Sequence, residues 1–282
     1  MNNNYLPSDY QTFIATSRYA RWLDDEGRRE TWGETVERYL ENIAKTWLKP
    51  VDLQEVRDAI LSLEVMPSMR SMMTAGKAAD RDNTCMYNCS YLPVDDPKSF
   101  DEAMFILLCG TGVGFSVERQ FITKLPDVPT LFQSETCVVI KDSKEGWAKG
   151  LRQVLALLWA GEIPKWDVSK VRPAGARLKT FGGRASGPAP LIDLFNFAIT
   201  TFKQAQGRKL SSLECHDLMC KIGEVVVVGG VRRSAMISLS NLSDDRMRHA
   251  KSGNWWENAA HRALANNSVS YTEKPDSMAF MR

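Results

Sequence analysis

The chain has 282 residues, of which 44% are hydrophobic and 25% charged, so it has the composition of an ordinary globular protein with a sizeable core. Its formal net charge of +2 is too close to neutral to indicate a nucleic-acid-binding or membrane-surface protein. The polar start, Met1–Asp9, contains no apolar stretch of a secretory signal, and no apolar run is long enough to span a bilayer. We therefore expect a cytoplasmic protein that has neither nucleic acid nor membrane as a partner.

The first third of the chain predicts helices. Trp32–Leu48 places apolar residues at helical spacing opposite charged ones, and Leu53–Leu63 predicts a second amphipathic helix, which ends before Pro67. The preceding stretch, Ser17–Glu26, mixes aromatic residues with arginines. It is either a solvated arm packed on the body or a contact surface. We assign residues 1–82 to an N-terminal helical region.

From Asn83 onward, short apolar runs alternate with glycine-rich turns and amphipathic helices. The expected strands are Cys89–Val94, Phe115–Glu118, Trp166–Val171, Met236–Leu239 and Ser268–Tyr271. The expected helices are Phe100–Cys109, Gly146–Trp159, Leu191–Gln204 and Leu213–Val228. Strands that alternate with helices predict an α/β fold with a largely parallel sheet over residues 83–282.

Three glycine-rich turns are candidate ligand sites. Cys109–Phe115 (CGTGVGF) follows a helix and leads into a strand, which is the reverse of a dinucleotide-binding turn, so a tight helix-to-strand turn is favoured. Thr180–Pro190 (TFGGRASGPAP) precedes a helix, and with Lys179 and Arg184 it is either an anion site or a solvated surface loop. Gly229–Ala235 (GGVRRSA) carries two arginines that either reach a base or phosphate or are solvated.

The cysteines and histidines do not form a recognisable metal site or hydrolytic triad. Six cysteines in a chain of this length are too few for a disulfide scaffold, and no second Cys or His pair completes a zinc site with Cys85 and Cys89. The remaining thiols are expected to be structural, and they are Cys109, Cys137, Cys215 and Cys220. Cys89 opens a predicted strand, where a reactive thiol can be exposed.

Taken together, these segments resemble one family. RYARWL at Arg18–Leu23, NC at Asn88–Cys89, GVGFSV at Gly112–Val117, VRPAG at Val171–Gly175, FGGRASGPAP at Phe181–Pro190, VRRSA at Val231–Ala235 and NNSV at Asn266–Val269 occur in this order in class II ribonucleotide reductases. Each motif is weak alone, but the ordered set is specific and runs from about Arg18 to Tyr271.

The resemblance implies a fold and a reaction. The family's fold is a ten-stranded α/β barrel of two five-stranded halves, so this chain would supply an N-terminal helical region and the first half-barrel, with an insertion at about 120–165. The implied activity is reduction of ribonucleoside di- or triphosphates by a cobalamin-initiated thiyl-radical mechanism. The implied partners are a deoxynucleoside triphosphate (dNTP) effector, the C-terminal half of the reductase and a thioredoxin-like reductant.

The resemblance also implies roles for individual residues. Cys89 is similar to the first of two cysteines that deliver electrons to the ribose 2′ position, while Ser68 and Asn88 resemble contacts to the substrate. Arg232 resembles the residue that passes effector identity to the substrate base. The effector-binding candidates are Asp96, which has Asp95 beside it, together with Lys179, Arg184, Ser186, Gly229 and Gly230.

The sequence also departs from the family. It contains no Asn-Pro-Cys-Gly-Glu-like segment, which in the family carries the radical cysteine, and by family order this segment would follow Arg282. We therefore expect the chain to be inactive alone and adenosylcobalamin to be bound mainly by the missing C-terminal part. The alternatives are a fragment of a class I large subunit and a non-catalytic dNTP-binding module.

Overall fold

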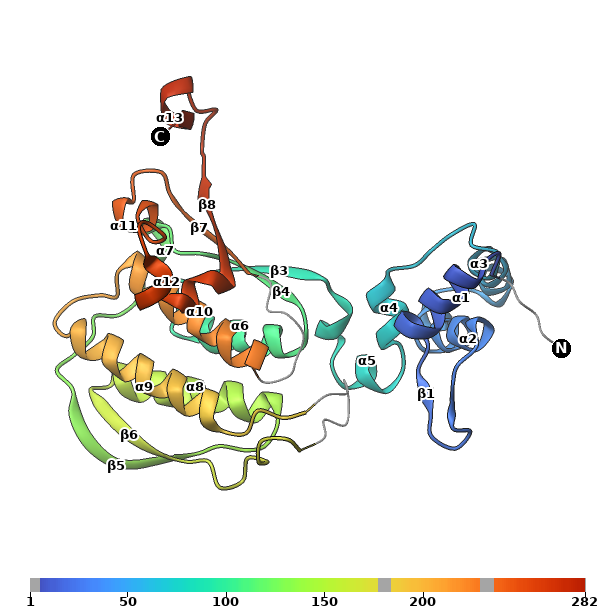
Figure 1. Cartoon of the computed structure of the whole chain (residues 1–282), viewed down its shortest axis with the longest axis horizontal. Helices are drawn as coiled ribbons and strands as arrows, with labels where there is room; N and C mark the ends of the chain where they lie inside the picture. The colour runs from blue at the N-terminus through green and yellow to red at the C-terminus, as the bar shows by residue number, and fades with distance from the viewer. Residues whose placement is uncertain (1–5, 177–183, 229–235, 282) are drawn as a thin grey trace. The chain divides into compact units, whose positions relative to one another are not determined.

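The computed structural model describes residues 6–176, 184–228 and 236–281 (Figure 1). The chain divides into two compact units, Met1–Asn88 and Cys89–Arg282, which we call unit 1 and unit 2. Among the described residues, no helix is both long enough and apolar enough to cross a membrane.

Unit 1 is a small helical body. Its helices are α1 (Asp9–Ile14), α2 (Trp32–Asn42), α3 (Pro50–Leu61), α4 (Met69–Thr74) and α5 (Lys77–Arg81). A capping box fixes the start of α2, because the side chains of Thr31 and Glu34 each accept a hydrogen bond from the other's backbone N–H. The first predicted helix ends at Asn42 and is followed by a 3₁₀ turn over Ala44–Thr46. The second begins earlier than predicted, with Pro50 in its first turn.

The stretch after α1 packs on unit 1 as an arm. A π-helical turn over Ala15–Tyr19 leads into an antiparallel ribbon of β1 (Trp22–Leu23) and β2 (Arg28–Arg29). The Arg21 guanidinium donates hydrogen bonds to the carbonyls of Met73 and Thr74, at 3.3 and 2.9 Å. Arg38 on α2 pairs with the buried Glu30 at 2.8 Å. Arginines that donate to backbone carbonyls therefore hold this arm on the helices.

Unit 2 is built on a four-stranded sheet in which every pairing is parallel. Its strands, in the order in which they pair, are β3 (Cys89–Pro93), β4 (Gly112–Ser116), β7 (Met236–Asn241) and β8 (Ala265–Ser270). The predicted α/β architecture with parallel strands is confirmed. That this sheet is half of a ten-stranded barrel stays a prediction.

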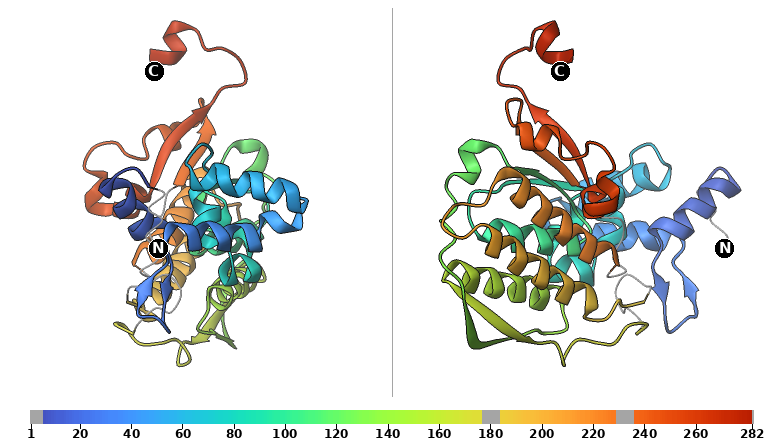
Figure 2. Two further views of the ribbon diagram at one scale, coloured as in Figure 1. Left: turned by 90° about the vertical axis from the view of Figure 1, so that its right-hand side faces the viewer. Right: turned by 60° about the vertical axis from the view of Figure 1, so that its left-hand side comes forward.

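Four helices lie between this sheet and a second, two-stranded parallel sheet (Figures 1 and 2). α6 (Lys98–Leu108) and α10 (Ser212–Val228) pack against each other on the four-stranded side, next to α8 (Lys144–Trp159) and α9 (Ala189–Gln204). β5 (Phe132–Val139) and β6 (Glu162–Asp167) cover α8. Fully buried aromatic side chains fill the space between these layers, and they include Phe100, Phe115, Phe195 and Phe202.

The second sheet is where the structure differs most from the prediction. β5 is absent from the sequence-based prediction because most of its side chains are exposed, so its sequence (FQSETCVV) has no clean apolar alternation. β6 begins at Glu162, four residues before the strand expected at Trp166. Pro164 is tolerated inside it because a strand in a two-stranded sheet has a free edge.

The glycine turn after α6 has the predicted form. Gly110 adopts φ of 82° between α6 and β4, a conformation that side chains disfavour. Gly112 and Gly114 lie within β4 itself. The segment is therefore a helix-to-strand turn, as the sequence predicts.

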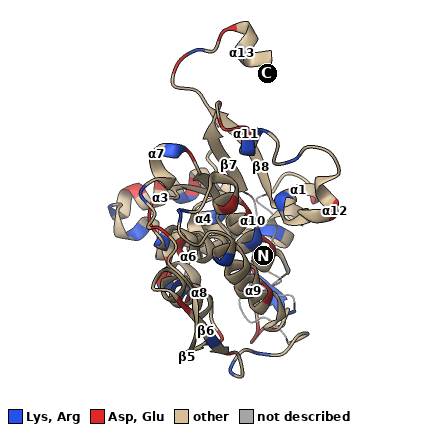
Figure 3. Cartoon of the chain, turned by 90° about the vertical axis from the view of Figure 1, so that its left-hand side faces the viewer, with Lys and Arg blue, Asp and Glu red and all other residues tan. Residues whose placement is uncertain are grey.

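The remaining described elements of unit 2 are α7 (Arg119–Ile122), α11 (Asp245–Arg248), α12 (Trp255–Asn258), a 3₁₀ turn at Ala260–Leu264 and α13 (Ser277–Met281). Asp217 on α10 accepts two hydrogen bonds from Arg262, at 2.7 and 2.6 Å. Because Arg262 belongs to the 3₁₀ turn, this pair joins the turn to α10. Burial of Asp217 raises its pKa but is outweighed by hydrogen bonds from His216 and Arg262 and by the nearby imidazole of His261, which hold the pKa far below its usual range. Basic and acidic positions are interspersed along the ribbon, in keeping with the near-neutral net charge (Figure 3).

Candidate functional site

Cys89 lies at the amino-terminal edge of the four-stranded sheet. It is the first residue of β3, its thiol group is exposed, and it pairs with Gly112, the first residue of β4. The next row across the sheet joins Ser90 to Val113, Met236 and Ala265. The starts of all four strands therefore meet at the edge that carries Cys89.

The two faces of this sheet differ in burial. Leu92, Phe115 and Met236 are buried on the face that packs on the helices. Successive strand residues point to opposite faces, so Cys89 and Tyr91 lie on the other face, and Tyr91 is 55% exposed. Ile237, in the same cross-strand row as Tyr91, is 47% exposed. Within the described residues of unit 2, the side chains on the face that carries Cys89 are thus exposed.

The loop predicted to read the substrate base lies outside the described residues. It includes Gly229, Gly230 and Arg232. The flanking elements are described: α10 ends at Val228 and β7 begins at Met236. Met236 is the register partner of Val113, one residue from the Gly112–Cys89 pair. The strand that follows the loop therefore begins at the Cys89 edge.

The candidate effector residues that are described lie elsewhere in unit 2. Asp96 follows the opposite end of β3, which spans roughly 13 Å from Cys89 to Pro93 at about 3.3 Å per strand residue. Its carboxylate accepts a hydrogen bond from the backbone N–H of Lys98 at 2.8 Å, while Asp95 forms an ion pair with Lys124 at 3.1 Å. Asp96 is thus the acidic residue of the two that makes no ion pair among the described residues.

Arg184 and Ser186 precede the start of α9, while Lys179 lies outside the described residues. The guanidinium of Arg184 donates to the carbonyl of Gly175 at 3.0 Å, and Ser186 donates to the carbonyl of Gly187 at 3.1 Å. Both side chains therefore have local backbone partners. Arg184 is exposed, so its guanidinium is still accessible to an anion.

The substrate-contact candidates Ser68 and Asn88 belong to unit 1. Ser68 is exposed, and its side chain makes no capping hydrogen bond at the start of α4. Asn88 is exposed and directly precedes Cys89 in the chain. Each is accessible within its own unit.

The thiols separate into two classes. Cys85, Cys109, Cys215 and Cys220 are buried. Burial raises the pKa of Cys215, and burial together with the nearby Asp217 raises that of Cys220 to about 12, so these two thiols are inert. Cys137, which is also expected to be structural, differs from these four because it lies exposed on β5. No group of three or more potential metal ligands occurs among the described residues.

Comparisons with known proteins give one consistent answer. Residues 118–201 match the family of the B12-dependent ribonucleotide reductase insertion domain. The adenosylcobalamin-dependent ribonucleoside-triphosphate reductase of Lacticaseibacillus paracasei is 29% identical over 92% of this chain, and that of Lactobacillus helveticus is 27% identical over 91%. This chain resembles the class II ribonucleotide reductases. It spans 44% of the length of each of these two reductases.

The fold also resembles that of part of a class II reductase. A crystal structure of a B12-dependent (class II) ribonucleotide reductase matches 91% of this chain and 45% of its own chain, with a TM-score of 0.76 and 24% identity. The segment that matches the class II insertion domain contains α7, β5, α8 and β6 and most of α9. The predicted insertion at about 120–165 falls within this segment.

The insertion is joined to the rest of unit 2 by a pair of residues that the sequence analysis missed. Arg152 on α8 donates to one carboxylate oxygen of Asp101 on α6, at 2.8 and 2.7 Å. The Asp101 side chain is 5% exposed, and its other oxygen has no hydrogen-bond partner among the described residues. Burial raises the pKa of Asp101, and Arg152 opposes that rise. The two residues are too far apart in sequence for any local pattern to pair them.

Proposed function

We propose that this chain supplies the substrate- and effector-binding half of an adenosylcobalamin-dependent ribonucleotide reductase. The observation that carries the proposal is the exposed Cys89 thiol at the edge of the sheet where β7, two strands away from β3, also begins. Its support is the similarity to enzymes named as ribonucleoside-triphosphate reductases. A ribonucleoside triphosphate is the proposed substrate, with Ser68 and Asn88 as contacts.

In the proposed reaction, Cys89 is one of two thiols that supply the electrons. The ribose 2′-hydroxyl leaves as water, a hydrogen takes its place, and the two thiols are oxidised to a disulfide, so two electrons and two protons pass to the nucleotide. The second thiol and the radical cysteine would come from the remainder of the protein. An external dithiol of the thioredoxin class then reduces the disulfide. An exposed position suits a thiol that must exchange with a second thiol.

Adenosylcobalamin would supply the radical initiation. Two grooves of unit 2 have volumes of about 560 and 430 Å³, each well below the space that a corrin ring with its nucleotide and adenosyl groups fills. Neither groove therefore fits the cofactor, and we derive no step through it. We propose that its binding surface belongs mainly to the part of the relatives that this chain does not span.

We further propose that a dNTP effector binds near Asp96, with Arg184, Ser186 and Lys179 as contacts. Asp96 and Cys89 stand at opposite ends of β3, so effector and substrate would occupy separate sites. Gly229, Gly230 and Arg232, which precede β7, would pass the identity of the effector to the substrate base. This is allostery in the strict sense, with two ligands coupled through one element.

The test is reconstitution. The chain is combined with a polypeptide that spans the remainder of the relatives, adenosylcobalamin and a dithiol, and deoxynucleotide formation is measured. Cys89→Ser should abolish turnover, while Cys137→Ser, the matched exposed thiol, should retain it. An unchanged rate for Cys89→Ser would refute the assignment of the thiol. If activity required an iron subunit in place of cobalamin, the chain would be assigned to class I.

The effector site is tested separately by calorimetry with dNTPs. Asp96→Asn should weaken binding, since a ribose 3′-hydroxyl would lose a charged acceptor, while the neighbouring Asp95→Asn should leave the affinity unchanged. Equal affinities for both variants would exclude Asp96. Effector binding by a chain that no partner complements would favour the alternative of a dNTP-binding module.

A further inference from the structure

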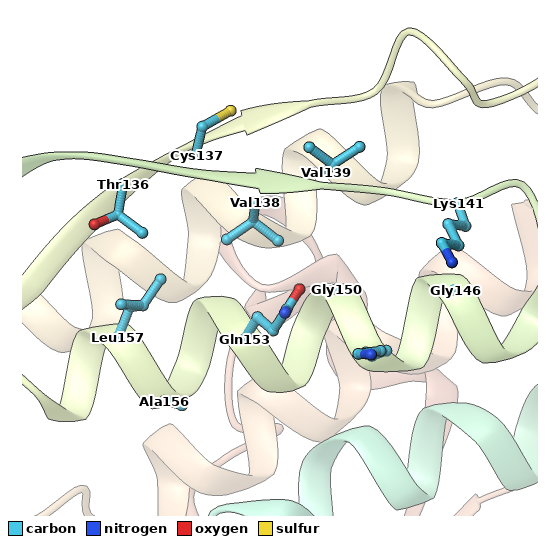
Figure 4. A pocket seen from close by; sticks show the side chains of 11 residues that line it. Thr136, Cys137, Val138, Val139, Lys141, Gly146, Gly150, Gln153, Ala156 and Leu157 are labelled. Atoms are coloured by element: carbon cyan, nitrogen blue, oxygen red, sulfur yellow. The ribbon is translucent and has the colours of Figure 1, made fainter.

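A groove of about 560 Å³ runs between β5 and α8, inside the insertion. Figure 4 shows Val138 pointing from β5 toward α8, while the side chains of Gln153 and Leu157 rise from α8 toward β5. The side chain of Lys141, just after β5, extends toward α8 near Gly146. None of the residues proposed above for substrate or effector lines this groove.

The charge of the groove is entirely positive. Lys141 and Lys149 line it, and its lining contains no aspartate or glutamate. Neither lysine makes an ion pair among the described residues, whereas Lys165 on the neighbouring β6 pairs with Glu135 at 2.5 Å. The carboxylate of Glu162, which contacts the groove residue Thr136, already accepts hydrogen bonds from Ser134 and Thr136 at 2.7 and 2.9 Å. Lys149 also borders a neighbouring groove lined by Asp101, Glu102 and Glu145, but it forms no ion pair with them. Two unpaired ammonium groups at one concave surface attract an anion.

The rest of the lining is mostly apolar. Val138, Ala156 and Leu157 provide aliphatic surface, and Val138 and Leu157 point toward each other across the groove (Figure 4). Gln153 supplies a neutral amide that can donate or accept a hydrogen bond. The groove therefore suits a ligand with an anionic group at the lysine end and an apolar body.

Two glycines on α8 set the shape of the groove. A Cβ atom at Gly146 would lie 2.3 Å from the carbonyl oxygen of Lys141, and one at Gly150 would lie 2.4 Å from the Cδ1 of Ile140. Glycine at these positions lets the end of β5 approach α8 closely. The backbone of Lys141 is thereby held against the helix that carries Lys149 and Gln153.

We propose that the β5–α8 groove binds a small phosphomonoester with an apolar body. A phosphomonoester carries close to two negative charges at neutral pH, so it balances the charge of two ammonium groups better than a singly charged carboxylate would. Lys141 and Lys149 contact the phosphate, and the aliphatic side chains contact the body. The site is separate from the proposed substrate and effector sites and does not depend on their assignment.

The test uses phenyl phosphate as the probe and lysine reactivity as the readout. The chain is reductively methylated with and without the probe, and the modification of each lysine is measured by mass spectrometry. Lys141 and Lys149 should react several-fold more slowly with the probe present, while Lys165 should be unchanged. Sodium chloride at the same ionic strength should protect no lysine selectively. Protection of all lysines alike, or of none, would overturn the proposal.

Variants separate a built site from general attraction. Lys141→Gln with Lys149→Gln should weaken binding of phenyl phosphate about fivefold in calorimetry, since both ammonium groups that contact the phosphate are lost. Lys165→Gln with Lys203→Gln, a control of equal charge, should leave the affinity within twofold. Leu157→Ser should reduce the preference for phenyl phosphate over inorganic phosphate. Equal weakening by both double variants, or no preference for phenyl phosphate, would refute the site.

Discussion

Replacing Arg152 by methionine tests whether the insertion is held on α6 by a buried charge pair. Arg152→Met leaves the carboxylate of Asp101, which is 5% exposed, without its partner. Breaking a fully buried ion pair in this way costs about 3–5 kcal/mol. The Arg152 side chain is 46% exposed, so water can partly take its place. We therefore expect unit 2 to lose about 2 kcal/mol of unfolding free energy at pH 7.

The loss should depend on pH with a definite sign. Burial already raises the pKa of Asp101, and removing Arg152 raises it further. The folded variant then retains a proton that the unfolded chain has released, so its stability falls as pH rises above the unfolded pKa of about 3.9. The deficit of Arg152→Met should thus be largest at pH 7 and nearly absent at pH 4.

Guanidinium unfolding at pH 7 and pH 4 measures this difference. Lys149→Met, an exposed position on the same helix, is the matched control and should change stability by less than about 0.5 kcal/mol. Adding Asp101→Asn to Arg152→Met should recover much of the loss, because the unpaired buried charge is gone. A deficit that is equal at both pH values, or below about 0.5 kcal/mol, would refute the pairing.

Three further results are expected. Gly150→Ala should destabilise unit 2 by up to about 2 kcal/mol in denaturant unfolding, because the clash with Ile140 outweighs the helix propensity gained, and Ile140→Val should relieve it by removing Cδ1; an additive double variant would contradict this. Hydrogen bonds from Arg28 and from the backbone of Thr31 lower the pKa of Glu34 to about 2, so Glu34→Gln should cost unit 1 about 1 kcal/mol at pH 7. That stability is present above the unfolded pKa and is lost as pH falls toward 2, so an equal cost at pH 7 and pH 2 would refute the cause. At pH 8, iodoacetamide should alkylate Cys89 and Cys137 in the folded chain and reach the four buried thiols only after unfolding, as peptide mass mapping would show.

The parts of the fold that follow local rules were predictable. The sequence predicts α2, which begins at the Thr31–Glu34 capping box, and the turn at Gly110. It predicts β7, in which Met236, Ser238 and Ser240 are buried and the residues between them are not. β5 escaped prediction because its exposed, polar side chains carry no alternation. Its existence depends on pairing with β6 and packing on α8, which are tertiary effects.

In the candidate site, the sequence predicts those features that depend on the position of a single residue. An exposed thiol at the start of β3 follows from the position of Cys89 before an alternating strand. The ion pair between Asp95 and Lys124, which distinguishes Asp95 from Asp96, is non-local, so no sequence pattern predicts it. The Asp101–Arg152 pair and the lysine-lined groove arise only when α8 packs between α6 and β5. No spacing rule relates residues that different elements bring together.

The register of the four-stranded sheet has a consequence for how the protein folds. Val113 and Met236 are neighbours, although the whole insertion separates them in sequence. Joining the two strands closes a long loop, whose entropic cost is lower once the intervening chain is compact. The insertion should therefore fold before the second half of the sheet docks, which would make assembly of the thiol-bearing edge a late, slow event typical of non-local parallel pairing.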